Sequence, residues 1–310
     1  MLYNCACERS TLVSNIAGKK SMNPLLKAAA FFARILPAPV KRAVYGFRPL
    51  ARLVRRTLNR AAPQGLSEAQ VAAGDLQGFT LALDMQTEKD YWLGMYEPEL
   101  QRALRDWVKP GAVMFDVGAN IGYVSLLLAR AGGENGRVTA FEALPANVAR
   151  TRRNLALNGM DRRVNVVHAA VIDRAGTARF LVHPSNAMGK AVGSAGRDIA
   201  DAYVQEIEVP GVALDDFAYG AEGAIPQVIK MDIEGGEVLA VRGMERLLTE
   251  ARPLLLIELH GQAAAAAVWE SLRRHGYAVR RMKEGYPQVE ALSDLDWKAY
   301  VIGDPAGSQG

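Results

Sequence analysis

The chain has 310 residues, half of them hydrophobic, and a formal net charge of +4. This composition can fill the core of a large domain and excludes an intrinsically disordered protein. Cys5 and Cys7 stand too close together to join distant segments, which excludes a disulfide scaffold and favours a reducing compartment, expected to be the cytoplasm. No uncharged apolar run reaches the roughly 18 residues that a membrane-spanning helix needs.

The net charge hides two regions of opposite sign. Residues 9–67 contain 12 Lys and Arg and no acid. Because Glu8 is the only acid before them, the rest of the chain keeps 25 basic and 32 acidic residues, a net charge of −7. A basic appendage is therefore joined to an acidic body, and the two regions need separate explanations.

The appendage divides into a tail and a helical segment. Residues 1–23 lack an apolar period and are expected to be disordered. Residues 24–66 are expected to form a basic amphipathic segment, interrupted at Pro49. Its apolar positions are Leu25, Ala29, Phe32 and Leu36, then Val40, Val44, Phe47, Ala51, Val54 and Leu58. The segment either lies on an anionic membrane surface through residues 24–60 or packs on the acidic body. Nucleic-acid contact is less favoured, since no aromatic residues alternate with the charges.

The body, residues 67–303 followed by a short tail 304–310, is organised around one strand, turn and helix. Residues 113–117 are apolar except for Asp116, as expected for a buried parallel strand, and residues 123–130 read as a helix. Gly118 and Gly122 between them permit a tight turn and the close approach of a ligand. The helix presents its free N–H groups to the same space. The pattern predicts a nucleotide site.

Two acids narrow the choice of nucleotide. In the dinucleotide pattern G-x-G-x-x-G the middle position is glycine, whereas here it is Asn120. Asp116 ends the first strand, and Glu142 ends the next strand, residues 137–142, where an acid can accept hydrogen bonds from both ribose hydroxyls. Carboxylates at the tips of two neighbouring strands repel a diphosphate and suit the ammonium and sulfonium groups of S-adenosylmethionine. We therefore predict this cofactor, with its methionine end held by Asp116, Gly118, Asn120 and Gly122 and its ribose by Glu142.

Three stretches then resemble the FkbM-type methyltransferases. They are residues 115–122 (FDVGANIG), 141–142 (FE) and 229–237 (IKMDIEGGE). The resemblance runs from about Tyr96 to about Tyr300 and implies methyl transfer from S-adenosylmethionine. Where the family usually has Phe-Glu-Pro, this chain has Ala143 in the third place, which changes the turn and leaves the ribose acid intact.

The next segments are expected to close the site. Residues 164–167 read as the third strand, so the following Ala169 and Ala170 should face the adenine, because ligands collect at the C-terminal ends of such strands. Residues 184–203 are rich in glycine and serine and predict a long loop over the acceptor. Glu97, at the start of a helix over residues 98–107, is a further candidate for lining the site.

Strands and helices alternate through the rest of the body. Strands are expected at 79–83, 206–209, 228–231, 254–259, 277–282 and 299–302, and helices at 145–158, 213–217, 238–248 and 263–275. This alternation predicts an α/β fold with a Rossmann-like, doubly wound and mostly parallel sheet of the class I methyltransferase type.

The candidate catalytic residues are Asp232, Glu234 and His260. Asp232 follows the strand at 228–231, and Glu258 and His260 share one face of the strand at 254–259, since side chains alternate along a strand. Methyl transfer to a hydroxyl needs a base near the acceptor. The same residues with Glu258 are also a possible ligand set for a divalent cation, but their spacing specifies none. Lys230 lies on an otherwise apolar strand and needs either a partner, for which Asp216 and Glu258 are the candidates, or a route to solvent.

The sequence therefore predicts an O-methyltransferase acting on a hydroxyl of a sugar, glycolipid or small molecule. One alternative is an NAD-linked oxidoreductase, which Asn120 and Asp116 disfavour. The other is a membrane-attached nucleotide-binding module without turnover. Acceptors of all three classes are compatible with this fold, because a fold does not encode the identity of the acceptor.

Overall fold

The computed structural model describes residues 23–36, 40, 47–183, 189–195, 203, 205–221, 223–296 and 298–306. It divides into two compact units, residues 1–62 and 63–310. The expectation of a disordered tail at 1–23 falls almost wholly outside the described residues, as does most of the tail at 304–310. Among the described residues, no helix is both long and apolar enough to cross a membrane.

The first unit contains the helices α1 (Pro24–Ile35) and α3 (Arg48–Ala61), which contact each other. The Asn23 side chain accepts a hydrogen bond from the Leu25 N–H and caps α1. Pro49 lies in the first turn of α3, where a proline costs nothing, so it begins a helix instead of kinking one. The buried positions of α1 are Leu26 and Ala33, whereas Leu25 and Phe32 of the predicted stripe are half exposed.

The second unit is built on a seven-stranded sheet with the order β12-β13-β11-β10-β3-β4-β5. Five neighbouring strands are parallel and β13 runs antiparallel to both of its neighbours. The strands are β3 (Val113–Val117), β4 (Arg137–Glu142), β5 (Val164–His168), β10 (Val228–Met231), β11 (Leu254–His260), β12 (Ala278–Arg281) and β13 (Lys298–Asp304). The predicted Rossmann-like α/β fold is confirmed, and the strand order reverses between β3 and β10, where such folds bind their ligands.

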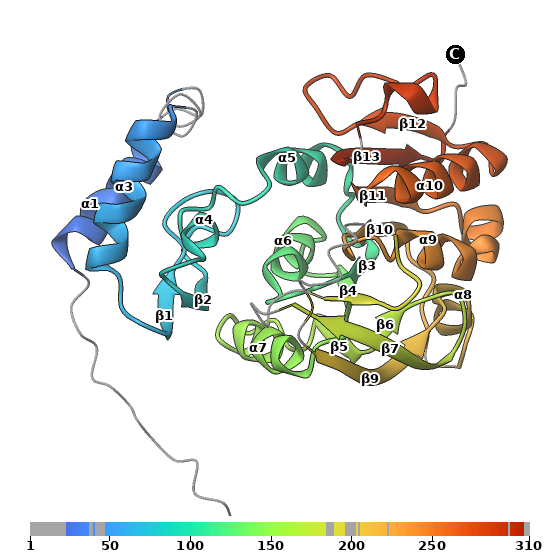
Figure 1. The fold of residues 1–310 in the computed structure, drawn as a ribbon, viewed down its shortest axis with the longest axis horizontal. Helices are drawn as coiled ribbons and strands as arrows, with labels where there is room; N and C mark the ends of the chain where they lie inside the picture. The colour runs from blue at the N-terminus through green and yellow to red at the C-terminus, as the bar shows by residue number, and fades with distance from the viewer. Residues whose placement is uncertain are drawn as a thin grey trace, which may run out of the picture. The chain divides into compact units, whose positions relative to one another are not determined.

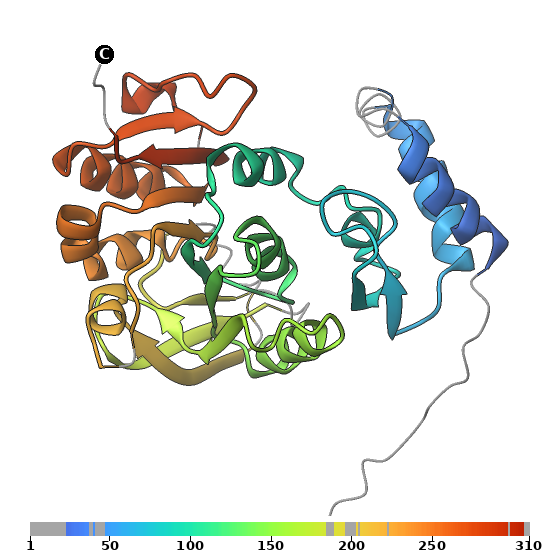
Figure 2. The same ribbon diagram turned by 180° about the vertical axis from the view of Figure 1, so that it is seen from behind.

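Helices cover both faces of this sheet, as Figure 1 and Figure 2 show. One face carries α5 (Pro98–Trp107), α6 (Tyr123–Ala131) and α7 (Pro145–Ala156), and the other carries α8 (Leu214–Ala218), α9 (Glu237–Ala240) and α10 (Gln262–Arg274). The core of the second face includes Phe115, Phe141 and Phe217, whose rings meet edge to face with centroids 4.9 to 5.7 Å apart.

The single helix predicted at 238–248 is wrong. The chain forms α9, a 3-10 turn (Val241–Gly243) and a π-helical turn (Leu247–Ala251). The carboxylate of Asp215 accepts hydrogen bonds from the backbone N–H groups of Arg246 and Leu247, both at 2.8 Å. Asp215 of α8 thus caps the helical turn that begins near Arg246. Because this cap comes from another element, the periodicity of the local sequence does not reveal that the helix is interrupted.

A second sheet, with the order β6-β9-β7-β8, lies beside the first (Figure 1). Its strands are β6 (Ala170–Val171), β7 (Gly176–Val182), β8 (Gly189–Ala191) and β9 (Gln205–Val212). The loop predicted at 184–203 therefore contains a strand, β8, which pairs antiparallel with β7. Residues 184–188 and 196–202 of that prediction lie outside the described part of the chain.

A third, two-stranded sheet precedes α5. It consists of β1 (Leu66–Gln70) and β2 (Thr80–Asp84), followed by the short helix α4 (Lys89–Trp92). Two asparagine side chains at the end of α7 hold β2 in place. The Oδ1 atom of Asn158 accepts from the Thr80 N–H at 2.8 Å, and the Oδ1 atom of Asn154 accepts from the Ala82 N–H at 2.7 Å. These bonds fix the segment that carries Tyr91 and Tyr96 next to the main sheet.

Candidate active site

A cavity of about 290 Å³ lies at the C-terminal ends of β3, β4 and β10. Seven of the ten residues predicted for the site line it: Gly118, Asn120, Glu142, Ala169, Ala170, Asp232 and Glu234. The other three, Asp116, Gly122 and His260, do not line it. The strand ends thus gather residues that are more than 100 positions apart in the chain.

The turn after β3 requires glycine at two positions. Gly118 has a φ of +84°, and a Cβ there would lie 1.9 Å from the backbone oxygen of Asp232. Gly122 has a φ of +81° and would place a Cβ 2.8 Å from the Thr151 side chain. Gly118 therefore allows β3 and β10 to approach, whereas Gly122 lets α6 pack on α7 and does not line the cavity itself.

Asn120 and Glu142 are joined within the cavity wall. The Asn120 N–H donates to Glu142 Oε2 at 2.7 Å, and the Leu144 N–H donates to Oε1 at 2.8 Å. Burial raises the pKa of Glu142 to about 7, although these N–H groups and Asn147 lower it. The Oδ1 atom of Asn120 is buried and has no hydrogen-bond partner among the described residues. A ligand that brings an N–H or O–H donor fits this orphaned oxygen.

Asp116 does not face the cavity, which corrects its predicted role. Its side chain is fully buried, and it accepts a hydrogen bond from the Ser125 hydroxyl at 2.5 Å. Its other oxygen lies 3.4 Å from Lys230 Nζ. Burial raises the pKa of Asp116, while Lys230 and Ser125 lower it. The prediction that two strand-end carboxylates select a cationic nucleoside therefore loses one of its two acids.

Lys230 pairs with neither Asp216 nor Glu258, so that prediction is wrong. Its ammonium group lies 3.4 Å from Asp116 and 3.8 Å from Asp232, and it donates to the Gly118 carbonyl at 3.2 Å. Burial lowers the pKa of Lys230, but the two carboxylates outweigh burial and raise it. Because Lys230 stands beside Asp116 in the register of β10 and β3, one buried ion pair holds the two strands at the point where the strand order reverses.

Apolar residues from both sheets form the far end of the cavity. Ala169 and Ala170 lie there with Leu144, Val171 and Phe180. The Ala169 N–H donates to the Glu142 carbonyl at 3.1 Å, which fixes the turn beside the end of β4. Phe180 belongs to β7 and was not predicted, since no local pattern shows that a second sheet returns to this turn.

Tyr91 and Tyr96 were also not predicted as site residues, and both line the cavity. Their ring centroids are 4.2 Å apart, and each ring also contacts Tyr123 on α6, at 4.9 and 5.7 Å. Burial raises the pKa of each hydroxyl. Glu97, the predicted candidate next to the start of α5, does not line this cavity, whereas its neighbour Tyr96 does.

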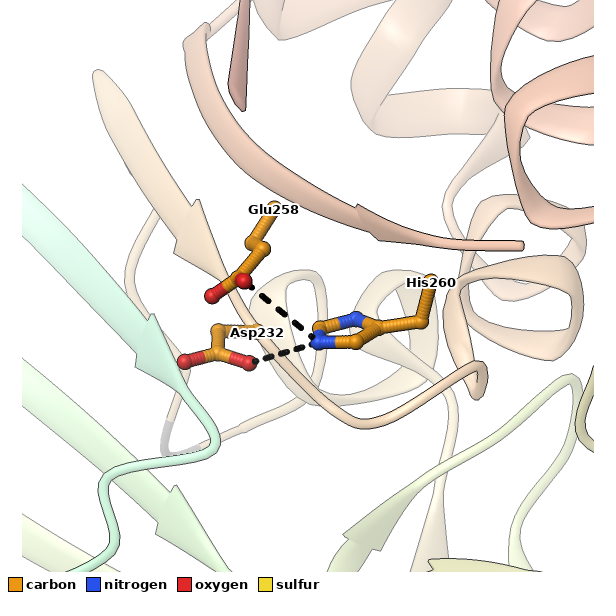
Figure 3. A group of neighbouring side chains, drawn as sticks. All are labelled: Asp232, Glu258 and His260. Atoms are coloured by element: carbon orange, nitrogen blue, oxygen red, sulfur yellow. Dashed lines mark ion pairs between the residues drawn. The ribbon is translucent and has the colours of Figure 1, made fainter. Parts of the chain in front are cut away.

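Charged side chains cluster between the ends of β10 and β11. Figure 3 shows His260 Nε2 directed at the carboxylates of Asp232 and Glu258, each 3.7 Å away. Glu234 lies 3.8 Å from the same nitrogen. Asp232 and Glu234 also line the cavity, so this cluster borders the space that the turn after β3 surrounds.

The nearest partner of His260 is Glu237, which was not predicted. Its Oε1 atom lies 3.0 Å from His260 Nδ1, and its side chain is fully buried at the start of α9. Burial lowers the pKa of His260, but Glu237, Asp232 and Glu234 outweigh it and raise the pKa to about 9. An imidazole that already holds a proton at neutral pH cannot act as a base, which speaks against that predicted role. Its contact with Glu237 depends on α9, a helix that the sequence pattern places one residue later.

A family model for the FkbM methyltransferase domain matches residues 116–279, more than half of the chain. The chain belongs to this family. It is therefore an S-adenosylmethionine-dependent methyltransferase, and the NAD-linked and non-catalytic alternatives find no support. The conclusion rests on the family match and not on the charge of Asp116.

The individual proteins that the chain resembles share less than 30% of its sequence. The chain is 28% identical over 242 residues to the 31-O-demethyl-FK506 methyltransferase FkbM of Streptomyces tacrolimicus, covering 70% of this chain and 87% of that protein. It matches the structure of methyltransferase FkbM from Methylobacillus flagellatus with a TM-score of 0.42 and 17% identity, covering 84% of this chain but only 60% of that one. A SAM-dependent O-methyltransferase from Thermotoga maritima gives a TM-score of 0.39 and 14% identity, covering 67% of this chain and 65% of that one.

Proposed function

We propose that this methyltransferase transfers the methyl group to a hydroxyl oxygen of a sugar, glycolipid or other small-molecule acceptor. The observation that carries the proposal is that Asp232 and Glu234 border the same cavity as the donor motif. A hydroxyl loses its proton on methylation and therefore benefits from a nearby carboxylate. The name of the Streptomyces relative describes an O-methylation of that protein's own substrate, which agrees with this chemistry.

The donor is proposed to lie along the wall formed by β3, β4 and the Ala169–Ala170 turn. Gly118 brings the backbone against the methionine part, and Asn120 Oδ1 offers its unbonded oxygen to the ammonium group. Glu142 retains lone pairs beyond its contacts to Asn120 and Leu144 and is placed to accept from the ribose hydroxyls. The apolar end around Ala170 suits the adenine ring.

The reaction then requires that the acceptor hydroxyl is positioned next to the methyl carbon and that one group accepts its proton. The acceptor oxygen bonds to the methyl carbon while the bond from that carbon to sulfur breaks and its electron pair stays on sulfur. The hydroxyl proton passes to a carboxylate, for which Asp232 is favoured, because Asp232 lines the cavity whereas His260 does not. Tyr91 and Tyr96 offer ring faces on which the body of the acceptor packs.

The test uses a donor with an isotopically labelled methyl group and a metabolite extract from cells that lack the protein. Label is expected to enter small molecules as methyl ethers, which mass spectrometry distinguishes from N-methyl and C-methyl products. The Asp216→Asn variant, which changes an exposed carboxylate on α8, serves as the control and should label the same products. Label found only on nitrogen or carbon would overturn the proposal.

We also propose that the N-terminal helices attach the enzyme to an anionic membrane surface. Several large apolar side chains of α1 are about half exposed, among them Phe31 at 58% and Phe32 at 52%. Basic residues such as Arg34, Arg52 and Arg56 share this unit. Exposed apolar rings together with cations are typical of helices that lie in a membrane interface.

Vesicle flotation tests this attachment on the full chain. Vesicles with anionic lipid should carry the wild type upwards, and vesicles of neutral lipid should carry much less. Changing both Phe31 and Phe32 to Asp should abolish flotation without changing donor binding. Equal flotation of the wild type and the double variant would contradict the membrane proposal.

A further inference from the structure

We propose that Asp232, Glu258 and His260 form a binding site for one divalent transition-metal cation. One ligand atom from each of the three residues lies within 4.8 Å of the other two. The group therefore combines one imidazole nitrogen with carboxylate oxygens from the ends of two neighbouring strands (Figure 3). The sequence alone left this possibility open, and the side-chain geometry now favours it.

The distances within the group fit a shared cation better than direct contacts. His260 Nε2 lies 3.7 Å from Asp232 Oδ1, 3.7 Å from Glu258 Oε1 and 3.8 Å from Glu234 Oε2. Hydrogen bonds between nitrogen and oxygen are shorter, at about 2.7 to 3.2 Å. Ligands that each lie about 2.0 to 2.2 Å from one ion are separated by about 3 to 4 Å. The imidazole is thus surrounded by oxygens at the spacing of a coordination shell.

An independent feature orients the imidazole for this role. Glu237 is fully buried and lies 3.0 Å from His260 Nδ1. A carboxylate on the second ring nitrogen of a ligating histidine fixes the tautomer and leaves the other nitrogen free to bind metal. Glu237 Oε1 also accepts from the Ile233 N–H at 3.3 Å, and its second oxygen has no hydrogen-bond partner among the described residues.

The local charge balance also favours a cation. In the part of the chain that the structure describes, two ammonium groups lie in this network beside the carboxylates of Asp116, Asp232, Glu234, Glu237 and Glu258. These are Lys230, near Asp116 and Asp232, and Lys298, 3.4 Å from Glu258. Five carboxylates and two ammonium groups leave three negative charges before any proton on His260 is counted. Since uncompensated charge is costly where it is buried, as at Asp116, Glu237 and Glu258, a divalent cation would relieve this repulsion.

The ligand set indicates the class of ion. Carboxylates alone suit Mg²⁺ and Ca²⁺, whereas an added imidazole favours Mn²⁺, Fe²⁺ or Zn²⁺. Asp232 reaches both this group and the main cavity, so the cation would border the acceptor. Its role rests on the proposed function: a hydroxyl bound to the ion would lose its proton more readily, and with Asp232 bound to the ion the proton would pass to Glu234, which also lines the cavity. The binding site itself does not depend on that role.

The test measures cation binding directly on the full chain after removal of metal with a chelator. Calorimetric titration with MnCl₂ and with ZnCl₂ should each give one site per chain, and MgCl₂ should bind more weakly. Glu258→Gln is expected to weaken Mn²⁺ binding at least about tenfold, because it removes a ligand. Glu237→Gln is expected to weaken it to a similar degree, because it removes the group that orients the His260 imidazole. Pulsed electron paramagnetic resonance of bound Mn²⁺ should show coupling to a nitrogen that is lost in His260→Gln.

A second His–Glu pair provides the matched control. His275 Nε2 lies 3.3 Å from Glu245 Oε2, and the Glu245 side chain is 45% exposed. Glu245→Gln should therefore leave Mn²⁺ affinity unchanged. Circular dichroism and thermal melting check that each variant is folded, and Glu258→Gln carries the test if His260→Gln does not fold.

Two outcomes would overturn the site. One is that neither Mn²⁺ nor Zn²⁺ binds the wild type at millimolar concentration, which would leave a proton on His260 as the occupant. The other is that Glu258→Gln binds Mn²⁺ as tightly as the wild type does. Calorimetry with S-adenosylmethionine on the same preparations separates the two proposals, because intact donor binding without cation binding removes only the metal site.

Discussion

The two ends of the cavity are built in different ways. The donor end comes from consecutive elements, β3 to β6, and consists largely of backbone: glycine turns, N–H groups and small apolar side chains. The acceptor end joins β10, α9 and β11 through contacts between charged side chains. The donor end is therefore specified by local sequence, whereas the acceptor end depends on contacts between distant segments.

Asp116 and Glu142 show this difference at the scale of single residues. Both lie at or near the tips of neighbouring parallel strands, yet only Glu142 lines the cavity. Asp116 stands next to Lys230 of β10 and forms an ion pair with it. Glu142 stands next to His168 of β5, whose ring contacts the Ala143 carbonyl, and Glu142 accepts instead from the N–H groups of Asn120 and Leu144. Whether an acid at the end of a strand lines the cavity therefore depends on the residue beside it on the neighbouring strand.

The largest expected effect tests whether Asp116 is structural. Lys230→Met removes the partner of a fully buried carboxylate and should lower the free energy of unfolding by about 3 to 5 kcal/mol. Adding Asp116→Asn should restore much of that loss, because the uncompensated charge is then gone. Guanidinium unfolding of the four members of this cycle gives the coupling. Additive losses in the double variant would contradict the buried pair.

The next effect concerns the acceptor end. Asp232→Asn removes the favoured proton acceptor and should slow methyl transfer by about 100-fold or more. Donor affinity should change little, since the Asn120 and Glu142 contacts remain. Single-turnover transfer of labelled methyl groups and donor calorimetry measure the two quantities, with Asp216→Asn as the control. If donor affinity falls as much as the rate does, Asp232 belongs to the donor end.

The contrast also explains how much could be read from the sequence. The order of strands and helices and the lining by Gly118, Asn120 and Glu142 follow from local patterns. Phe180 and Tyr91 were missed because their segments return to the site through pairing of β7 and anchoring of β2. The partner of Lys230 depends on strand register, which no periodicity of a single strand contains.

A third effect tests the burial of Glu142 through pH. Its pKa is raised from 4.5 to about 7 in the folded chain, so the folded state binds more protons than the unfolded state between these values. The contribution of this group to stability should therefore fall by about 2 to 3 kcal/mol as the pH rises from 5 to 8. The amide in Glu142→Gln does not titrate, so this variant lacks the pH-dependent contribution to stability.

Chemical denaturation of the wild type and of Glu142→Gln at pH 5 and at pH 8 isolates the effect. The variant should gain stability relative to the wild type at the higher pH, whatever constant cost the amide adds. A difference between the two proteins that stays the same at both pH values would show that the N–H donors of the loop offset burial completely.

The smallest effect decides whether the donor end works as proposed. Glu142→Ala removes a buried acceptor for the ribose hydroxyls and should weaken S-adenosylmethionine by about 1 to 3 kcal/mol, or about 5-fold to 150-fold in Kd. Calorimetry measures the change, and Glu134→Ala, at an exposed acid, is the control that should leave Kd unchanged. Because Glu142 also holds the N–H groups of Asn120 and Leu144, Glu142→Gln is needed beside it, as the amide keeps one acceptor oxygen. Intermediate weakening by Gln would place the effect on the ribose bonds, whereas an unchanged Kd in both variants would remove Glu142 from the donor site.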